Sequence, residues 1–399
     1  MEHRAGRVAL GAAKIIVTMA SVGVVVLGCY GWTVVRQVQT GTATDNVIAP
    51  PSASTTPVPK APGQDMNILL VGLDSRTDAH GNPLPRSVLD ALNAGTDDGQ
   101  LNTDTLIVVH VPGDGGAASA VSIPRDSYVD IAGGFGKHKI NSAYAYGMNA
   151  EADRLRAQGD TDQAAIGRQS LTAGRRNLVQ TVQNFTGVSI DHYAEVNLYG
   201  FDQISQALGG VPVCLNKPVH DSYSGADFAA GEQTLSGVRA LQFVRQRHGL
   251  ANGDLDRERR QQAFLASAAH QLLSAGTLTD PGKLSAIITA VQNAVVVDQG
   301  WDLFQFAQQV QGIAGANITF DTIPIVDIAY WTPADGVAVQ VDPAQVRAFV
   351  AGRFDRVKPT STTPPSSSSS TPATSSKQVP PSSSTAPPPV TASGVTCVD

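Results

Sequence analysis

The chain has 399 residues, 42% of them hydrophobic and 16% charged, so it is long enough to bury a sizeable core. Its formal net charge of −6 gives no general basic field, which argues against nucleic acid as a partner. Any binding of phosphate groups must therefore come from a local cluster of basic side chains.

The first regular segment that the sequence predicts is an uncharged run of 21 residues at 15–35. About 20 apolar residues are needed to span a bilayer as a helix. Arg4, Arg7 and Lys14 precede the run, so the positive-inside rule places residues 1–14 in the cytoplasm. A cleaved signal peptide is the alternative, but its apolar region is usually only about 7–15 residues long. We therefore expect a single-pass membrane anchor with an extracytoplasmic C-terminal portion; a buried core helix is disfavoured, because a polar segment follows.

Two segments have compositions that cannot build a core. Residues 36–64 contain few large apolar side chains, which predicts a disordered, extended stalk. The tail at 358–399 is rich in Ser, Thr and Pro and ends in a segment that contains a cysteine. Residues 65–357 are then the folded domain.

Within that domain, short β-branched runs alternate with amphipathic segments. Strands are expected at 67–73, 105–111, 118–123, 193–197, 211–215, 240–245 and 318–325. Helices are expected at 175–185, 199–208, 257–273, 283–291 and 301–310. This alternation predicts a single α/β domain, in which a mixed central sheet carries helices on both faces.

The chain has three cysteines, which differ in their surroundings. Cys29 falls in the predicted anchor and is expected to be an inert apolar residue. Cys214 and Cys397 both lie in the predicted extracytoplasmic part, where disulfides persist. We predict that these two pair and tie the tail to the domain. The alternative is two free thiols, which are poorly tolerated in oxidising surroundings.

The common phosphate-loop, serine hydrolase and zinc protease motifs are absent, and what remains is a set of Asp and Arg residues at strand ends. Asp74 ends the first predicted strand and Asp104 begins the next. If these carboxylates converge, a hard divalent cation such as Mg²⁺ would relieve their repulsion. The alternative is that each Asp only caps a turn.

Basic residues follow the later strands. Arg125 comes directly after the predicted strand at 118–123, and Arg245 and Arg247 are two positions apart at the end of the one at 240–245. On an extended chain the last two would share one face, where an anion between them would relieve their repulsion. Lys137 and Lys139 in a Gly-rich loop add positive charge. Exposed basic strand ends are the alternative for any one of these residues.

The next segment, at 253–270, has the pattern of a helix start. Asp254 is suited to cap the helix, and Arg257 and Gln261 then lie four apart on one face. Because a helix N-terminus favours an anion, these residues are expected beside the other arginines. The alternative is a solvated first turn, and surface positions are expected for Glu258, Arg259 and Arg260.

Several strings, taken together, resemble the LytR–CpsA–Psr family in order and spacing; they are NILLVGLDSR, NTDTLIVVHV, VSIPRDSYVDI, KINSAYAYG and VRQRHG…GDLDRERRQQ. The resemblance covers roughly residues 65–357. It implies an α/β domain that holds a polyprenyl pyrophosphate in a long apolar tunnel, with Mg²⁺, or alternatively Mn²⁺, as cofactor.

Residue by residue, the resemblance implies the following roles. The metal ligands would be Asp74 and Asp104, with Asp254 as a third. The catalytic diphosphate ligands would be Arg125, Arg245 and Arg247, supported by Lys139, Arg257 and Gln261. Where the family often has an arginine, this chain has Asn102, so Arg76 or Arg86 is expected to supply that phosphate contact.

The implied activity is phosphotransfer, in which a peptidoglycan hydroxyl attacks the polymer-bearing phosphate and polyprenyl phosphate leaves. Such chemistry consists mainly of positioning and charge stabilisation. No general base is evident, although Asp74 and Asp126 are candidates. Arabinogalactan is the first choice of polymer, ahead of teichoic acid or capsule. A polyprenyl-pyrophosphate hydrolase and a non-enzymatic protein that binds wall polymer or lipid remain the alternatives.

Overall fold

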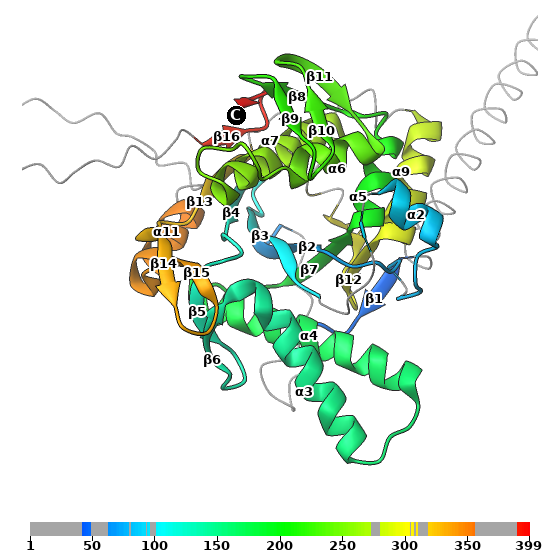
Figure 1. The fold of residues 1–399 in the computed structure, drawn as a ribbon, viewed down its shortest axis with the longest axis vertical. Helices are drawn as coiled ribbons and strands as arrows, with labels where there is room; N and C mark the ends of the chain where they lie inside the picture. Colours follow the sequence, from blue (N-terminus) through cyan, green and yellow to red (C-terminus); the bar gives the residue numbers. More distant parts are fainter. Residues whose placement is uncertain are drawn as a thin grey trace, which may run out of the picture.

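A computed structural model describes residues 42–48, 63–79, 81–92, 94–95, 101–272, 280–303, 305–306, 309, 318–355 and 389–399. Its centre is an eight-stranded sheet with the order β1-β12-β7-β2-β3-β4-β13-β16 (Figure 1). The strands are β1 (Ala43–Asp45), β2 (Met66–Leu73), β3 (Thr103–Val111), β4 (Ser119–Ser122), β7 (His192–Asn197), β12 (Val295–Asp298), β13 (Thr319–Thr322) and β16 (Val390–Thr391). Parallel and antiparallel pairs alternate irregularly, so the sheet is mixed.

Helices cover both faces of this sheet, because alternate side chains of each strand point to opposite sides. One face packs against α3 (Ala143–Ala157), α4 (Gln163–Thr186) and α11 (Pro343–Asp355). The other packs against α5 (Leu198–Ala207), α6 (Gly237–Arg245), α7 (Asp254–Leu272) and α9 (Pro281–Ala294). The predicted fold class, an α/β domain with a mixed central sheet and helices on both faces, is confirmed.

Smaller elements surround the sheet. Three small sheets are hairpins, formed by β5 (Tyr128–Ile131) with β6 (Gly136–Lys139), β9 (Val219–Asp221) with β10 (Ala226–Phe228), and β14 (Asp327–Thr332) with β15 (Gly336–Gln340). A three-stranded sheet contains β11 (Gly231–Leu235), β8 (Val211–Leu215) and β17 (Cys397–Val398). The remaining helices are α2 (Arg86–Ala91) and the short 3₁₀ helix η1 (Ile140–Ser142).

The strand expected at 240–245 is wrong, since these residues belong to α6. Ala240, Leu241, Phe243 and Val244 are buried, and this spacing fits one face of a helix as well as a short buried strand. The prediction of a disordered stalk at 36–64 is also wrong in its first half, because Ala43–Asp45 forms β1 and pairs in parallel with β12. Of the expected helix at 301–310, the structure describes residues 301–303, 305–306 and 309, and among these 303, 305, 306 and 309 are helical.

A buried ionic group fastens α4 to the sheet. Arg175 is 8% exposed, and its guanidinium donates to both carboxylate oxygens of Glu195, at 2.8 and 3.0 Å, and to Asp45 at 2.6 Å. The Tyr193 hydroxyl donates to Glu195 at 2.6 Å. We call Arg175, Glu195, Asp45 and Tyr193 the core arginine cluster. Burial alone would lower the pKa of Arg175, but the facing Glu195 carboxylate holds it well above its ordinary value.

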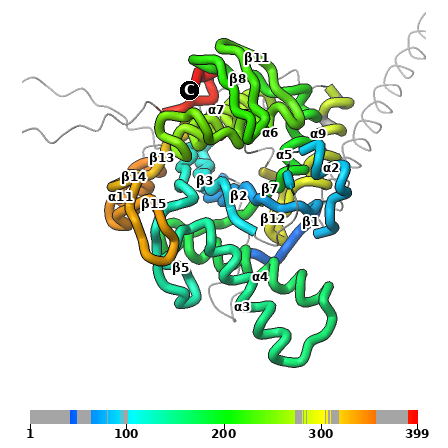
Figure 2. The backbone as a smooth tube through the Cα atoms, viewed as in Figure 1, coloured from blue at the N-terminus to red at the C-terminus, as the bar shows by residue number. Residues whose placement is uncertain are grey.

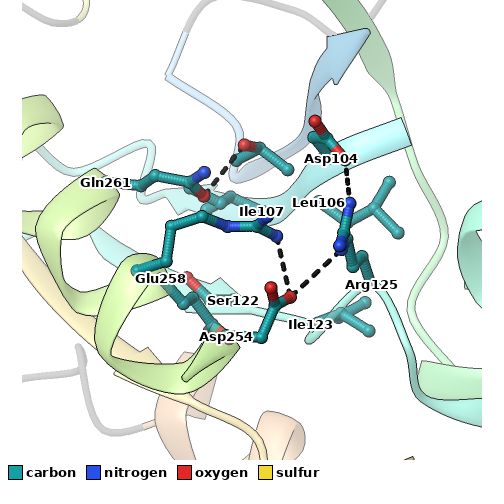
Figure 3. A pocket seen from close by; sticks show the side chains of 11 residues that line it. Asp104, Leu106, Ile107, Ser122, Ile123, Arg125, Asp254, Glu258 and Gln261 are labelled. Atoms are coloured by element: carbon teal, nitrogen blue, oxygen red, sulfur yellow. Dashed lines mark hydrogen bonds and ion pairs between the residues drawn. The ribbon is translucent and has the colours of Figure 1, made fainter. Parts of the chain in front are cut away.

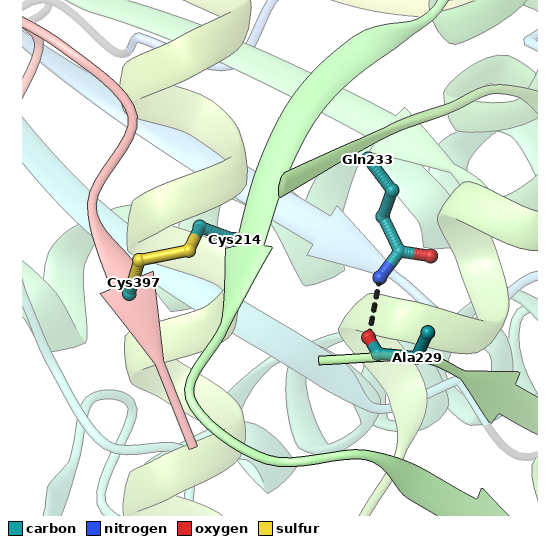
Figure 4. Close-up of a disulfide and its surroundings, with 4 residues drawn as sticks. All are labelled: Cys214, Ala229, Gln233 and Cys397. Atoms are coloured by element: carbon teal, nitrogen blue, oxygen red, sulfur yellow. Dashed lines mark hydrogen bonds between the residues drawn. A yellow bond between two sulfur atoms is a disulfide. The ribbon is translucent and has the colours of Figure 1, made fainter. Parts of the chain in front are cut away.

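The C-terminal segment returns to the domain. Cys397 of β17 forms a disulfide with Cys214 of β8, the pair that the sequence predicts (Figure 4). The end of the chain lies beside α7 (Figure 2), where the Arg260 guanidinium donates to the main-chain oxygen of Asp399 at 2.6 Å. The tail is therefore part of the fold from residue 389 onward.

The predicted anchor at 15–35 lies outside the described residues. Within the part of the chain that the structure does describe, no helix combines the length and the apolar character that crossing a bilayer requires.

Candidate functional site

A large apolar cavity lies between the sheet and the helices of its second face. Its volume is about 220 Å³, and β2, β7, α5, α6 and α7 supply most of its lining. Apolar side chains dominate, among them Leu70, Val196, Phe201, Leu241, Val244 and Phe264. Asp74, Asp104 and Arg245 line the same cavity. The cavity therefore offers an apolar interior with charged groups on one part of its wall, which is typical of a site for an amphipathic ligand.

A charged cleft adjoins this cavity at the ends of β3 and β4. Arg125 lies between Asp104 and Asp254 (Figure 3); its guanidinium pairs with Asp104 and donates to Asp254 at 3.1 Å. Asp254 also pairs with Arg257 at 2.7 Å and with Arg247 at 3.2 Å. We call Arg125, Arg247, Arg257, Asp104 and Asp254 the cleft cluster. Three guanidinium groups thus face two carboxylates, which leaves one excess positive charge.

The cleft cluster gives its buried arginines opposite electrostatic surroundings. Burial opposes the charged form of Arg125, but Asp104 and Asp254 outweigh it and raise the pKa of Arg125. For Arg257, burial and the repulsion from Arg125 together lower the pKa. The Nε of Arg257 is buried and has no hydrogen-bond partner among the described residues. An anion in the cleft would supply that partner and offset the repulsion.

Gln261 joins the cleft to the apolar cavity, because it lines both. Its side-chain oxygen accepts a hydrogen bond from the Thr105 hydroxyl at 2.9 Å. Arg257 and Gln261 both line the cleft from α7, in agreement with the predicted helical face. Asp254 is the first residue of α7, and its carboxylate binds arginines, so the capping role expected for it is not what the structure shows.

The other predicted phosphate ligands lie around the cleft. Arg245 is the last residue of α6 and lines the apolar cavity, where its guanidinium donates to the Leu92 oxygen at 3.4 Å. Since Arg245 and Arg247 are not on one strand, the shared face predicted for them is wrong. Arg247 is half exposed and faces Asp254. Arg247 thus contacts the cleft cluster through Asp254, whereas Arg245 lies on the wall of the apolar cavity.

Three basic residues have other partners. Arg76 pairs with Asp74 at 3.3 Å and donates to the Ala94 oxygen at 3.1 Å. Lys139 lies 3.6 Å from Asp126, and Arg86 is exposed and pairs with Asp90 within α2. Of these, Arg76 is held closest to the charged wall of the apolar cavity, through its contact with Asp74.

The carboxylates expected to bind a metal fall into two groups. Asp74 and Asp104 both line the apolar cavity, whereas Asp254 is held by three arginines. Within the described ranges, no group of three or more His, Cys, Asp or Glu side chains is arranged to hold a metal ion. Mg²⁺ commonly takes only one or two carboxylates together with phosphate oxygens, and Asp74 and Asp104 fit that donor set. Asp254 fits it less well, since it pairs with three arginines, whereas among the described residues Asp74 and Asp104 each pair with one.

The structure also reveals two residues of α7 that the sequence placed on the surface. Glu258 lines the cleft and accepts a hydrogen bond from the Thr322 hydroxyl at 2.9 Å. Removal from water raises the pKa of Glu258 to about 7. Arg260 is fully buried, stacks over the Phe243 ring and pairs with Gln246. The helical spacing of Asp254, Glu258 and Gln261 could have identified Glu258 as a lining residue.

Several known proteins are similar to this chain in sequence and in fold. The chain is 47% identical over 293 residues to the cell wall biosynthesis protein LcpA of Corynebacterium glutamicum, a match that covers 73% of this chain but only 56% of LcpA. It is 30% identical to the polyisoprenyl-teichoic acid–peptidoglycan teichoic acid transferase TagU of Halalkalibacterium halodurans, over 66% of this chain and 72% of TagU. The crystal structure of B. subtilis TagV shares the fold, with a TM-score of 0.53, 24% identity, and coverage of 73% of this chain and 98% of TagV.

The family match agrees with these relatives. The LytR_cpsA_psr family matches residues 32–348, which include β1 and all of the residues of the cleft cluster. The match extends over more than half of the chain, and it confirms the resemblance found in the motifs around Asp74, Asp104, Arg125 and Asp254. The chain belongs to the LytR_cpsA_psr family.

Proposed function

We propose that this protein is a phosphotransferase that moves a glycopolymer from a polyprenyl-pyrophosphate carrier to peptidoglycan. The observation that carries the proposal is the junction of the apolar cavity with the charged cleft, because the two share Asp104, Thr105, Ile107 and Gln261 as lining residues. A polyprenyl pyrophosphate has a matching division into an apolar chain and a doubly charged headgroup.

In this scheme the polyprenyl chain occupies the apolar cavity and the diphosphate lies in the cleft. Arg125 and Arg257 exchange part of their pairing with Asp254 for phosphate oxygens, and Arg245 and Arg247 approach from α6 and the segment after it. Guanidinium groups fit phosphate oxygens through paired hydrogen bonds. Their charge stabilises the negative charge that spreads over the transferred phosphoryl group, which is the main requirement of such a reaction.

Asp74 and Asp104 would hold Mg²⁺, or Mn²⁺, beside the diphosphate. The bound cation would neutralise charge on the diphosphate oxygens. Arg76 would keep Asp74 in place through its ion pair at 3.3 Å. Lys139 pairs with Asp126, so in this scheme it does not bind the diphosphate directly. We propose that it supports the site by positioning the Asp126 carboxylate.

The relatives support this reaction class. TagU is named as a transferase of teichoic acid to peptidoglycan, and LcpA as a protein of cell wall biosynthesis. We further propose that residues 15–35 anchor the chain in the membrane with the domain outside the cell, where the lipid carrier supplies the energy of the bond. Arabinogalactan is the first polymer to test, followed by teichoic acid and capsule.

The decisive experiment incubates the full-length chain in detergent with a synthetic polyprenyl-pyrophosphate oligosaccharide and soluble peptidoglycan fragments. We expect covalent transfer that stops with EDTA and resumes with Mg²⁺. Release of the oligosaccharide phosphate to water, without transfer, would instead make the protein a hydrolase. Tight binding of the donor without turnover, under conditions that keep the chain folded, would make it a binding protein.

A further inference from the structure

A second cavity lies on another side of the cleft. Its volume is about 170 Å³, and its walls come from the segment after β4, the segment before α7, and the β14–β15 hairpin. It shares Asp254 with the cleft but shares no lining residue with the apolar cavity. Figure 1 shows the hairpin at one edge of the molecule and α5, which lines the apolar cavity, toward the other, with β3 between them. We call this cavity the hairpin pocket.

The hairpin pocket combines hydrogen-bonding groups with exposed apolar surface. Asp126, Asn252 and Asp254 supply two carboxylates and an amide. On the opposite wall, Ile328 and Val337 are 50% and 57% exposed, although both are large apolar residues. Such a pairing of polar groups with an uncovered apolar wall is typical of a binding site.

An exposed aromatic ring extends this wall. Trp331 is 67% exposed and lies directly opposite Val337 in the β14–β15 pairing. Because residues directly opposite one another in an antiparallel pair point to the same face, the indole lies beside Val337, which lines the pocket, while Trp331 itself stands outside the lining residues. An exposed tryptophan on a rigid hairpin offers a large contact area at little conformational cost, which suits recognition.

The chemistry of the pocket favours a sugar over the other groups in the proposed reaction. A pyranose ring has an apolar C–H face, which packs on an aromatic ring, and hydroxyl edges, which donate to carboxylates and amides. A phosphate-rich chain is disfavoured, because none of the described side chains that line this pocket is cationic. The apolar cavity, rather than this pocket, suits the lipid.

We propose that the hairpin pocket binds the acceptor glycan, with its sugar on Trp331 and its reacting hydroxyl directed toward the cleft beside Asp254. This inference rests on the proposed phosphotransfer. In such a reaction the attacking and leaving oxygens lie roughly in line across the phosphorus. Polyprenyl phosphate leaves toward the apolar cavity, so the attacking hydroxyl must enter from another side, and the hairpin pocket opens there.

The bond changes balance without a further reactant. The acceptor oxygen forms a bond to the phosphorus, and the bond between that phosphorus and the oxygen of polyprenyl phosphate breaks. The hydroxyl proton passes to the Asp126 carboxylate and from there to water, since Asp254 is already held by three arginines. Lys139, 3.6 Å from Asp126, positions that carboxylate.

The test measures glycan binding separately from turnover. A soluble, uncrosslinked peptidoglycan tetrasaccharide is titrated into the full-length chain by calorimetry, without donor. Trp331→Ala should weaken binding about fivefold to tenfold, and Trp331→Phe, which keeps an aromatic ring, by less than about threefold. Val326→Ala is the matched control, because Val326 is 55% exposed beside the same hairpin but its neighbour across the hairpin, Gln340, does not line the pocket, whereas Val337 opposite Trp331 does; this variant should bind as the wild type does. Equal binding by wild type and Trp331→Ala would overturn the proposal.

Kinetics and vesicle binding separate the remaining outcomes. In the transfer assay, Trp331→Ala should raise the KM for the acceptor by the same factor and leave the KM for the donor unchanged. A rise in the donor KM alone, or loss of binding to phosphatidylglycerol vesicles with acceptor KM unchanged, would overturn the proposal in favour of donor or membrane contact. If the wild type binds the tetrasaccharide through Trp331 but transfers nothing, the glycan site stands and the proposed phosphotransfer fails.

Discussion

The core arginine cluster and the cleft cluster both set arginines against carboxylates, but they differ in how completely the guanidinium groups are paired. Each of the three nitrogens of Arg175 donates to a carboxylate, and a tyrosine hydroxyl completes the network. In the cleft, Arg125 and Arg257 share one oxygen of Asp254, while Arg257 keeps a buried nitrogen without a hydrogen-bond partner among the described residues.

This difference separates a structural ionic group from a binding site. A saturated buried network holds elements together and has no capacity for a ligand. A cluster with excess charge and unmet donors is costly in the free protein and is relieved when an anion binds. Whether each guanidinium nitrogen has a hydrogen-bond partner therefore distinguishes a binding site from a structural ionic group better than the mere presence of buried arginines does.

Breaking the saturated network should have the largest effect. Arg175→Met would leave Glu195 and Asp45 without their counter-charge and should lower the free energy of unfolding by about 3–5 kcal/mol. Urea unfolding followed by circular dichroism measures this change. Arg168→Met, an exposed position on the same helix, is the control and should unfold like the wild type. A loss below about 1 kcal/mol for Arg175→Met would show that the network is not essential to the fold.

Breaking the cleft should change activity more than stability. Arg125→Ala should lower kcat about 10²–10³-fold, because charge on the transferred phosphoryl group loses its nearest guanidinium. The free energy of unfolding should fall by only about 1–2 kcal/mol, since Asp104 and Asp254 are partly exposed and remain solvated. Initial rates and urea unfolding of the same preparation give both values. Arg86→Ala, which removes an exposed arginine of α2, should keep the wild-type kcat.

The metal ligands should be separable from the arginines. Asp74→Asn should weaken Mn²⁺ binding, measured by electron paramagnetic resonance, by at least about tenfold. Asp90→Asn, in the exposed ion pair with Arg86, should leave Mn²⁺ affinity unchanged. If Mn²⁺ binds wild type and Asp74→Asn equally, Asp74 is not a ligand. EDTA should abolish transfer without changing the unfolding of the substrate-free protein, because the core arginine cluster needs no cation.

Glu258 should add a pH dependence to the stability, which is the smallest of these effects only when it is taken over less than one pH unit. Burial raises the pKa of Glu258 from its ordinary value of 4.5 to about 7, so between these values the folded protein holds a proton that the unfolded chain has lost. Stability should therefore fall as pH rises from 4.5 to 7, by at most about 1.4 kcal/mol per pH unit, and this contribution should be constant above pH 7. Urea unfolding in EDTA at pH 5 and pH 7.5 measures the slope. Glu258→Gln should reduce it, and an unchanged slope would assign the dependence to other groups.

The sequence predicted the sheet better than it predicted the ionic contacts. The strands β2 and β3 appear as nearly continuous apolar runs, β7 shows a strand-like alternation, and α5, α7 and α9 show helical spacing, so local pattern sufficed for them. The strand prediction for residues 240–245 was wrong because a short apolar run fits a buried helix and a buried strand equally well. Hydrophobicity also missed β1, which is only three residues long and polar at its end.

In the candidate site, too, the sequence predicted which residues take part better than it predicted their contacts. The linked motifs pointed to the residues of the cleft cluster, which lie at the start of β3 (Asp104), after β4 (Arg125), after α6 (Arg247) and in the first turn of α7 (Asp254 and Arg257). They did not predict that Asp254 would join three arginines, or that Asp45 would meet Arg175 across 130 positions of sequence. Such contacts depend on how distant elements pack, and the charge pattern of one segment does not show which other segment it will contact. Glu258 was missed for this reason, because only the packing of α7 against Thr322 removes it from water.

The disulfide determines how a cut chain would behave. Residues 356–388 connect α11 to β16, and the chain beyond them is joined to β8 through Cys397 and Cys214. A protease that cleaves this connection would thus produce two fragments that still migrate as one species in non-reducing electrophoresis. Adding a reductant would separate them, and the released peptide would carry β17 away from its neighbour in the three-stranded sheet. Cleavage in the Ser/Thr/Pro-rich segment therefore does not change the electrophoretic migration until the Cys214–Cys397 disulfide is reduced.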